Sequence, residues 1–204
     1  YSATADVGSK KKKGPANETQ PIDLCALAIN LGCTFVARSF SGSKKQLTSI
    51  LKAAMSHKGF ALIDVISPCV TFNNNDESMR SYGYVKENEI TLHMADYIPH
   101  FNPMVEIEVP EGHYRDITLH DGSTIRLETI SDEHDPSNAV AALTALHEAE
   151  AGKKHVTGLL YFDATKPSLA EDLGLVDQAL VDVSDEALRP DRASLDALNA
   201  EFLA

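Results

Sequence analysis

The chain has 204 residues, of which 43% are hydrophobic, and its formal net charge is −12 at pH 7. This length allows a sizeable buried core, whereas the negative charge argues against nucleic acid or an anionic membrane surface as the main partner. No apolar run approaches the roughly 18 residues of a membrane span and no signal peptide is present, so we expect a soluble, cytoplasmic protein.

The first 20 residues have no hydrophobic periodicity and are predicted to form a loop. Lys10 to Lys13 could contact a phosphate group, but a solvated lysine run is the more common use of such a segment. The first residue is Tyr1 and not methionine, and we therefore expect the chain to be a piece of a longer protein.

A helix is predicted next, because Ile22 to Leu31 is apolar nearly all round and is followed by Gly32. Cys25 lies inside this helix and Cys33 lies beside its end. We interpret both cysteines as small buried hydrophobic residues, since none of the three cysteines forms the C-x-x-C pair typical of metal or redox sites.

A βαβ unit is predicted over the following residues. Thr34 to Arg38 is a short β-rich run, and Ser41-Gly42-Ser43 is a typical helix start. Gly59 ends the helix, and the apolar run from Phe60 to Ile66 predicts a buried strand. The helix has its apolar residues at i, i+3, i+4 and i+7, namely Leu47, Ile50, Leu51 and Ala54. Such a crossover pairs its two strands in parallel.

Cys69 is the candidate ligand residue of the chain. Pro68 stops the preceding strand because proline has no amide proton to donate. Cys69 is therefore expected in the loop beyond the carboxyl end of a central strand, which is the ligand-binding edge of open parallel α/β sheets. The alternative is a loop thiol without a partner, and one cysteine cannot hold zinc or an iron–sulfur cluster by itself.

After about position 75 the predicted elements change from a βαβ unit to short strands, a helix and a C-terminal arm. We therefore divide the chain into a first region 1–75 and a second region 76–204. Short strands are predicted at 105–109, 116–119 and 123–130, with a turn at His120-Asp121-Gly122. Asp135-Pro136-Ser137 is expected to cap a helix that runs to about Ala151, and a further strand to follow at 156–162. The final forty residues indicate an arm that packs on a partner.

The sequence gives little support for a zinc site, a nucleotide-binding site or a nucleophilic hydrolase. The histidines after position 90 are scattered and lack the spacing of helical zinc sites, and no dinucleotide, Walker or nucleophile-elbow motif occurs. Pattern alone therefore predicts a parallel α/β ligand-binding domain with a candidate cysteine, and no particular reaction.

Four motifs in the first 73 residues resemble, in order, the β subunit of 2-oxoacid:ferredoxin oxidoreductases of the two-subunit type, which act on 2-oxoglutarate or pyruvate. Residues 156–161 and 188–190 resemble that subunit's C-terminal region more loosely. The four motifs are Tyr1-Ser-Ala-Thr-Ala-Asp-Val-Gly8, Gly32-Cys-Thr-Phe-Val-Ala-Arg38, His57-Lys-Gly-Phe60 and Ile66-Ser-Pro-Cys-Val-Thr-Phe-Asn73.

The resemblance implies an enzyme that uses thiamine diphosphate and Mg²⁺ to decarboxylate a 2-oxoacid oxidatively, with 2-oxoglutarate favoured over pyruvate. A 4Fe–4S cluster would pass the electrons to ferredoxin, and coenzyme A would receive the acyl group. The implied fold is part of a thiamine-diphosphate-binding domain followed by a mixed α+β region, assembled with an α subunit. Cys69 matches the family's fourth cluster ligand, and Ser2 and Thr4 match a segment near the cofactor and substrate pocket.

The sequence also departs from the family. The other three cluster cysteines and the Gly-Asp-Gly…Asn motif that binds Mg²⁺ and diphosphate precede the segment that matches Tyr1, and none of them occurs here. We therefore expect this piece to be inactive alone. Two alternatives remain open, namely a non-oxidative thiamine-diphosphate enzyme and a non-catalytic assembly module.

Overall fold

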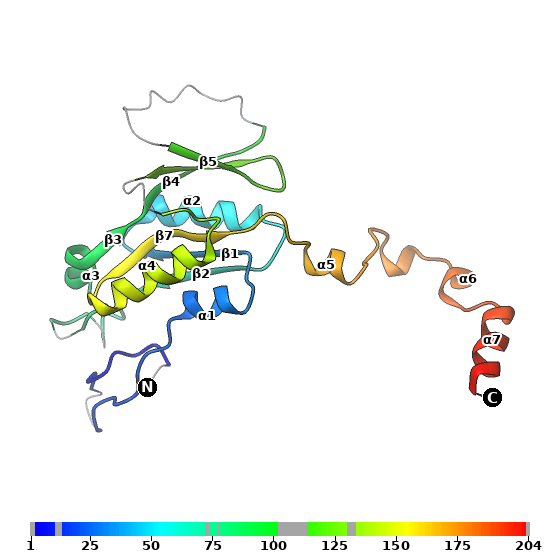
Figure 1. The fold of residues 1–204 in the computed structure, drawn as a ribbon, viewed down its shortest axis with the longest axis horizontal. Helices are drawn as coiled ribbons and strands as arrows, with labels where there is room; N and C mark the ends of the chain where they lie inside the picture. The colour runs from blue at the N-terminus through cyan, green and yellow to red at the C-terminus, as the bar shows by residue number, and fades with distance from the viewer. Residues whose placement is uncertain are drawn as a thin grey trace. The chain divides into compact units, whose positions relative to one another are not determined.

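The computed structural model of the chain describes residues 3–10, 14–71, 74–76, 78–101, 114–129 and 134–202 (Figure 1). The chain divides into two compact units, Tyr1–Ser168 and Leu169–Ala204. The expected strand at 105–109 and the candidate residue Ser2 lie outside the described residues. The region boundary expected after residue 75 stays a prediction.

The first unit is built on a four-stranded sheet with the strand order β2-β1-β7-β3. β1 pairs in parallel with β2 and antiparallel with β7, while β3 pairs in parallel with β7. The α/β fold class is confirmed, with a sheet that is only partly parallel. The four strands are β1 (Phe35–Phe40), β2 (Ala61–Ile66), β3 (Glu89–Thr91) and β7 (His155–Phe162).

The βαβ unit is confirmed, because α2 (Lys44–Met55) connects the parallel strands β1 and β2. All six residues of β1 are buried. The expectation of a buried central strand at 60–66 is wrong, since β2 is an edge strand of the described sheet and only Ile66 is fully buried along it. An apolar run makes a strand hydrophobic on both faces, but it does not specify how many neighbouring strands it will have.

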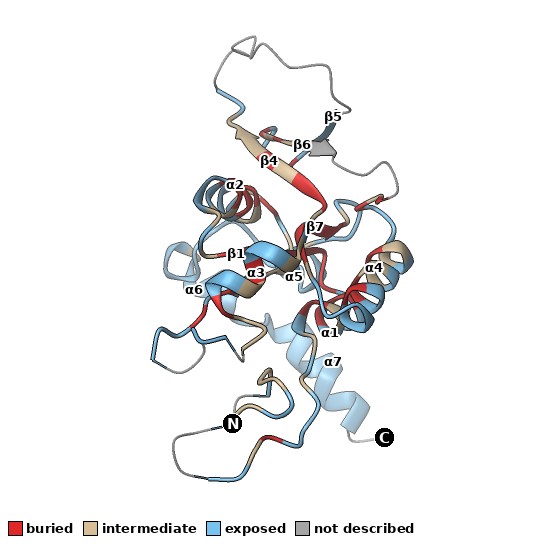
Figure 2. Cartoon of the chain, turned by 90° about the vertical axis from the view of Figure 1, so that its left-hand side faces the viewer, coloured by how far each residue is buried: buried red, intermediate tan, exposed pale blue. Residues whose placement is uncertain are grey.

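Helices cover both faces of this sheet, and the buried residues lie where they meet it (Figure 2). α1 (Leu24–Asn30) and α4 (Ala139–Ala151) share one core cluster with Val36, Val156 and Leu160. α2 shares a second cluster with Phe35 and Leu159. As predicted, Cys25 and Cys33 are both buried.

A second, antiparallel sheet with the order β4-β6-β5 contributes to the same core as α2. Its strands are β4 (His93–Ile98), β5 (Tyr114–Thr118) and β6 (Thr124–Thr129). The predicted hairpin turn at residues 120–122 is confirmed, because β5 and β6 pair on either side of it. The helix α3 (Tyr82–Asn88) and the strands β3 and β4 were not predicted from the sequence.

The predicted helix that ends at Ala151 is α4, but it begins later than expected. Asn138 caps it and accepts hydrogen bonds from the amides of Val140 and Ala141. The Asp135 carboxylate instead accepts hydrogen bonds from the amide and hydroxyl of Ser137, which closes a turn before the helix.

The described part of the second unit, residues 169–202, is a series of short helices without a core of its own. They are α5 (Leu169–Asp172), the 3₁₀ helix η1 (Leu180–Asp182), α6 (Asp185–Leu188) and α7 (Arg192–Phe202). None of the residues 169–202 is buried. No helix in the described part of the chain is both long enough and apolar enough to span a membrane.

Candidate functional site

The candidate site lies at the edge of the sheet where β1 and β2 end. Because β7 runs antiparallel to β1, its first residue, His155, lies at this same edge. A small core cluster of Phe40, Ile66 and Val85 supports the edge, and the Ser41 amide donates a 3.0 Å hydrogen bond to the Ile66 carbonyl. The ends of β1 and β2 are thereby fixed against each other and against α3.

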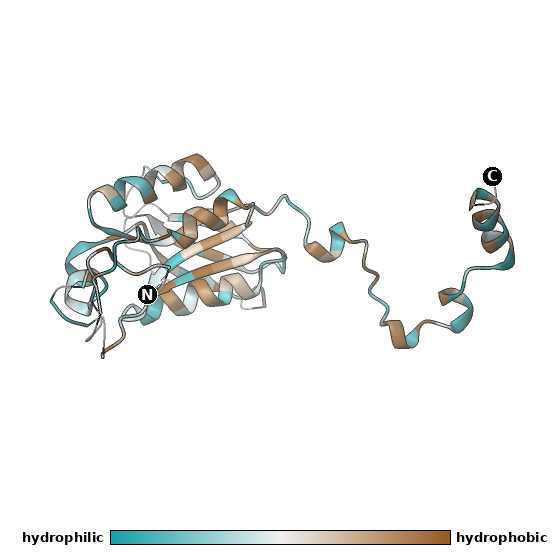
Figure 3. Cartoon of the chain, turned by 90° about the horizontal axis from the view of Figure 1, so that it is seen from below, coloured by the Kyte–Doolittle hydropathy of each residue, from teal (hydrophilic) through white to brown (hydrophobic). Residues whose placement is uncertain are grey.

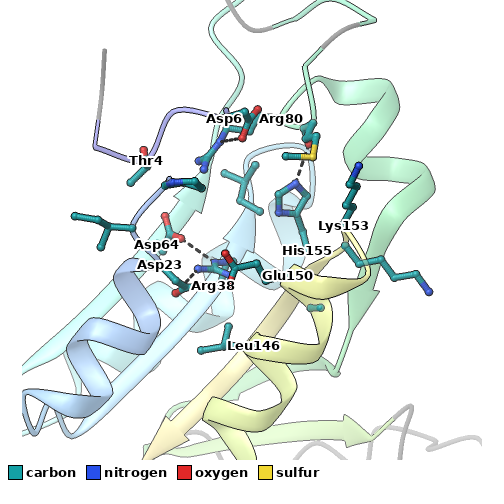
Figure 4. Close-up of a pocket in the computed structure, with 16 residues that line it drawn as sticks. Thr4, Asp6, Asp23, Arg38, Asp64, Arg80, Leu146, Glu150, Lys153 and His155 are labelled. Atoms are coloured by element: carbon teal, nitrogen blue, oxygen red, sulfur yellow. Dashed lines mark hydrogen bonds and ion pairs between the residues drawn. The ribbon is translucent and has the colours of Figure 1, made fainter. Parts of the chain in front are cut away.

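A pocket of about 110 Å³ lies beside this edge (Figure 4). Residues that are distant in the sequence line it, because the amino-terminal loop, β1, β2, α4 and the start of β7 meet there. Its polar lining residues include Thr4, Asp6, Asp23, Arg38, Asp64, Arg80, Glu150, Lys153, Lys154 and His155.

Arg38 forms the floor of this pocket, and it is 8% exposed. Its Nη2 donates to the Asp23 carboxylate at 2.9 Å and its Nε to the Asp64 carboxylate at 2.8 Å. Burial acts to lower the pKa of Arg38, but the negative charge around it outweighs burial and raises that pKa, so the guanidinium stays charged. Asp23 also accepts a hydrogen bond from the Ala26 amide and so caps α1.

Cys25 lies close to Arg38 but cannot act as a thiolate ligand. Burial raises the pKa of its thiol to about 12. Its sulfur lies 3.8 Å from the Ala37 carbonyl, toward which the S–H points. Cys33 is likewise buried, and its sulfur lies 3.0 Å from the Phe60 carbonyl.

The rim of the pocket is held by two further polar contacts. Arg80 pairs with Asp6 at 3.3 Å, which ties the loop before α3 to the amino-terminal loop. His155 Nε2 donates to the Met79 carbonyl at 2.8 Å. Burial is the main cause that lowers the pKa of His155, and the charges of Arg38 and Arg80 act in the same direction. His155 is therefore neutral at pH 7 and acts as a hydrogen-bond donor.

The structure locates two of the three predicted site residues. Thr4 lines the pocket beside Asp6, and Ser2 falls outside the described residues. Cys69 is exposed and lies three residues beyond the end of β2, with Pro68 buried just before it. Cys69 does not line the pocket. Its position beyond the carboxyl end of the strand is as expected, although that strand is an edge strand.

The described residues do not form a metal site, and the pocket beside Arg38 is too small for a whole cofactor. No group of three or more His, Cys, Asp or Glu side chains among them could hold a metal ion. The pocket beside Arg38, at about 110 Å³, is also much smaller than the several hundred Å³ of a site for a cofactor-sized ligand. A second, more open hollow of about 580 Å³ is lined by α1 and α4. Among the described cysteines only Cys69 is exposed, and its expected role as a cluster ligand and that of Thr4 near the cofactor stay predictions.

Sequence reasoning missed the polar centre of this edge, above all Arg38 and Asp64. One signal was available, since an arginine in a run of buried β residues needs an anionic partner. In the parallel pairing of β1 with β2, Arg38 stands directly opposite Asp64. Asp23 could not be found in this way, because its contact with Arg38 depends on how α1 packs.

Comparisons with known proteins agree with the sequence motifs. Residues 2–65 match the family described as "Thiamine pyrophosphate enzyme, C-terminal TPP binding domain". A 2-oxoacid:ferredoxin oxidoreductase subunit beta from Sulfolobus sp is 38% identical over 106 residues, which are 52% of this chain and 32% of that subunit. The 2-oxoglutarate synthase subunit KorB of Methanocaldococcus jannaschii is 35% identical over 99 residues, 46% of this chain and 37% of the subunit.

A solved structure has the same fold. It is a 2-oxoglutarate:ferredoxin oxidoreductase from Magnetococcus marinus with 2-oxoglutarate, coenzyme A and succinyl-CoA bound, with a TM-score of 0.60 and 22% identity. The match covers 97% of this chain and 52% of that one. Over about half of its length the chain is similar to β subunits of 2-oxoacid:ferredoxin oxidoreductases, and the matched part spans about a third of the length of the first curated relatives.

Proposed function

We propose that this chain works within the β subunit of a 2-oxoacid:ferredoxin oxidoreductase. The assembled enzyme, with an α subunit, would use thiamine diphosphate and Mg²⁺ to decarboxylate a 2-oxoacid oxidatively. It would pass electrons through a 4Fe–4S cluster to ferredoxin and the acyl group to coenzyme A. The observation that carries this proposal is the position of Cys69, directly after the segment 2–65 that matches the thiamine pyrophosphate family.

Cys69 is proposed as one cluster ligand. Its thiol is exposed, so a cluster could reach it without unfolding the sheet, whereas Cys25 and Cys33 are buried. Pro68 is buried next to it and fixes the backbone from which the thiol projects. A 4Fe–4S cluster needs four ligands, so the other three thiolates must come from residues outside this chain.

The residues around Arg38 would act as a rigid support for this edge. Arg38 joins α1, through Asp23, to β2, through Asp64, and Asp64 lies five residues before Cys69. Thiamine diphosphate, when bound, supplies the electron sink for decarboxylation. The chain's own contribution would be a fixed edge, a contact through Thr4 at the pocket and the thiolate of Cys69.

We favour 2-oxoglutarate over pyruvate as the substrate. This preference is supported by the names of relatives, since the KorB subunit of M. jannaschii is a 2-oxoglutarate synthase subunit and the M. marinus structure is an oxidoreductase with 2-oxoglutarate bound. Comparison of the kcat/KM of the assembled enzyme for the two 2-oxoacids tests it directly. A higher kcat/KM for pyruvate would contradict the preference without affecting the role of Cys69.

The test of the cluster role is Cys69→Ser in the complete β subunit, assembled with its α subunit. Serine keeps the side chain's size but removes the soft sulfur donor that iron prefers. Iron per heterodimer, the electron paramagnetic resonance signal of the cluster and the rate of ferredoxin reduction should all fall, while thiamine diphosphate still binds. Cys33→Ser is the matched control, because it removes a buried thiol from the loop just before β1 and should leave the iron content unchanged.

The outcomes separate the proposal from its alternatives. Unchanged iron and unchanged electron transfer in Cys69→Ser would contradict the cluster role of this residue. An assembled wild-type enzyme that binds thiamine diphosphate but contains no iron would instead favour a non-oxidative enzyme. A subunit that binds neither iron nor thiamine diphosphate would favour a non-catalytic assembly module.

A further inference from the structure

The second unit, residues 169–204, carries many large apolar side chains that it does not bury; we call it the C-terminal arm. Of the described residues 169–202, all are exposed except Val183, which is half-buried. The exposed side chains include Leu169, Val181 and Phe202, which are 73%, 89% and 83% exposed. Figure 3 shows apolar and polar residues alternating along the arm. Apolar surface of this extent in a folded chain is typical of an interaction site.

The last helix of the arm, α7, is amphipathic. Its apolar residues Leu195, Leu198 and Phe202 are spaced i, i+3 and i+7 and therefore share one face. The opposite face carries small residues, namely Ala193, Ala197 and Ala200. A helix that presents such a face to no other part of its own unit has the form of a segment that lies in an apolar groove.

The arm is also strongly acidic. Residues 169–204 contain nine Asp or Glu and two Arg, so they carry −7 of the chain's net charge of −12, and the preceding residues carry −5. Both arginines are paired within the arm, Arg189 with Asp185 and Arg192 with Asp196, each at 3.3 Å. The charge that the arm presents to a partner is therefore negative.

We propose that the C-terminal arm docks on the α subunit, in an apolar groove bordered by lysine or arginine side chains. This inference rests on the proposed function, because that function supplies the second subunit. A second copy of this chain fits less well, since both units carry net negative charge and like charges oppose association. The 36 residues of the arm are enough for one side of a stable interface, which needs about 20 to 30 residues.

The test compares two variants that add the same charge to opposite faces of α7. The first carries Leu195→Glu, Leu198→Glu and Phe202→Glu, and the matched control carries Ala193→Glu, Ala197→Glu and Ala200→Glu. The complete β subunit with each set is titrated with purified α subunit, and the Kd is measured by calorimetry at 50 and 300 mM NaCl. Light scattering of each β subunit alone measures self-association.

We expect the first variant to raise the Kd by at least about 30-fold, the effect of losing an anchor residue at the centre of an interface. The control variant should raise the Kd by less than about 3-fold, and salt should weaken wild-type binding because it screens the charges.

Equal Kd values for both variants and wild type would overturn the docking of the arm while leaving the enzyme assignment in place. Binding that does not weaken with salt would contradict the proposal that lysine or arginine side chains border the groove. Dimers of the β subunit alone that require the arm would show that the arm binds a second copy of this chain and not the α subunit. Failure of wild-type β to bind α would overturn the inference, whereas the iron content of Cys69→Ser tests the proposed function separately.

Discussion

Stability should fall at acid pH because of His93, the first residue of β4, whose side chain is buried among the two sheets. It is 1% exposed, and its Nε2 lies 3.2 Å from the Leu159 carbonyl. A carbonyl only accepts, so Nε2 carries the proton, while the buried Nδ1 has no hydrogen-bond partner among the described residues. The His134 ring lies 5.5 Å away, centroid to centroid. Protonation of His93 would therefore create a buried cation beside a second histidine, with an N–H that has no acceptor.

The cost follows from the pKa of His93. Burial, with the charge of His134, lowers this pKa from 6.5 to about 4. One pKa unit corresponds to about 1.4 kcal/mol, so a proton on His93 costs the folded state about 3 kcal/mol more than the unfolded state. At a pH well above 6.5, His93 is unprotonated in both states and nothing is lost. As the pH falls from 6.5 to 4, the unfolded state binds the proton first, and the free energy of unfolding should decrease by up to about 1.4 kcal/mol per pH unit.

The assay is urea unfolding of the full chain between pH 7.5 and 4.5, with His93→Gln as the variant. The Gln amide nitrogen can replace Nε2 as the donor to Leu159, but it does not titrate. We expect the dependence of the unfolding free energy on pH to become shallower by up to about 1.4 kcal/mol per pH unit, which corresponds to one proton. His147→Gln, at an exposed position on α4, is the control and should keep the wild-type slope. A slope in His93→Gln as steep as that of wild type would refute this reasoning.

Two further predictions concern stability. Asp64→Asn removes a charged acceptor from the buried guanidinium below the pocket and should lower the free energy of unfolding by about 1.5 to 3 kcal/mol. The same change at Asp96, in an exposed ion pair, should cost less than about 1 kcal/mol, and equal losses in urea unfolding would contradict the role of the buried pair. Gly158→Ala should cost about 2 to 3 kcal/mol, because Gly158 has φ +123° and a Cβ would lie 3.3 Å from the His93 amide nitrogen. Gly83→Ala is its control, since a Cβ there meets nothing within 4 Å, and a similar loss of melting temperature in both would argue against strain at Gly158.

Local patterns in the sequence predicted the elements that depend on neighbouring residues. The βαβ unit, the β5–β6 hairpin, α4 and β7 all follow from periodicity, caps and turns within a few residues. The position of Cys69 was predictable for the same reason, since it needs only a strand and the proline that ends it. Long-range pairing was not predictable in this way. β7 enters the sheet between β1 and β3 although it lies more than 110 residues after β1.

The strand β4 was missed because its inward-facing residues are not a hydrophobic series. The buried positions at its start are His93 and Ala95, while Met94 and Asp96 face the other way. A histidine at a core position hides the alternation by which a strand is recognised. The preceding helix α3 is only seven residues long and contains Gly83, which gives it too little periodicity to be predicted.

Asp64, on β2, and Cys69, in the loop after β2, should contribute to the protein in different ways. Asp64 is half-buried and holds Arg38, so its contribution should appear in the stability of the chain. Cys69 is exposed in the loop beyond the same strand, and exposed side chains away from caps and ion pairs change stability by about 0.5 kcal/mol or less when replaced. A thiol in such a position contributes little to folding, so a large effect of Cys69→Ser on iron content without a loss of stability would have to arise from ligand chemistry. If Asp64→Asn instead lowers the stability of the chain more than its iron content, the buried ion pair of Arg38 and Asp64 acts as the support of that loop.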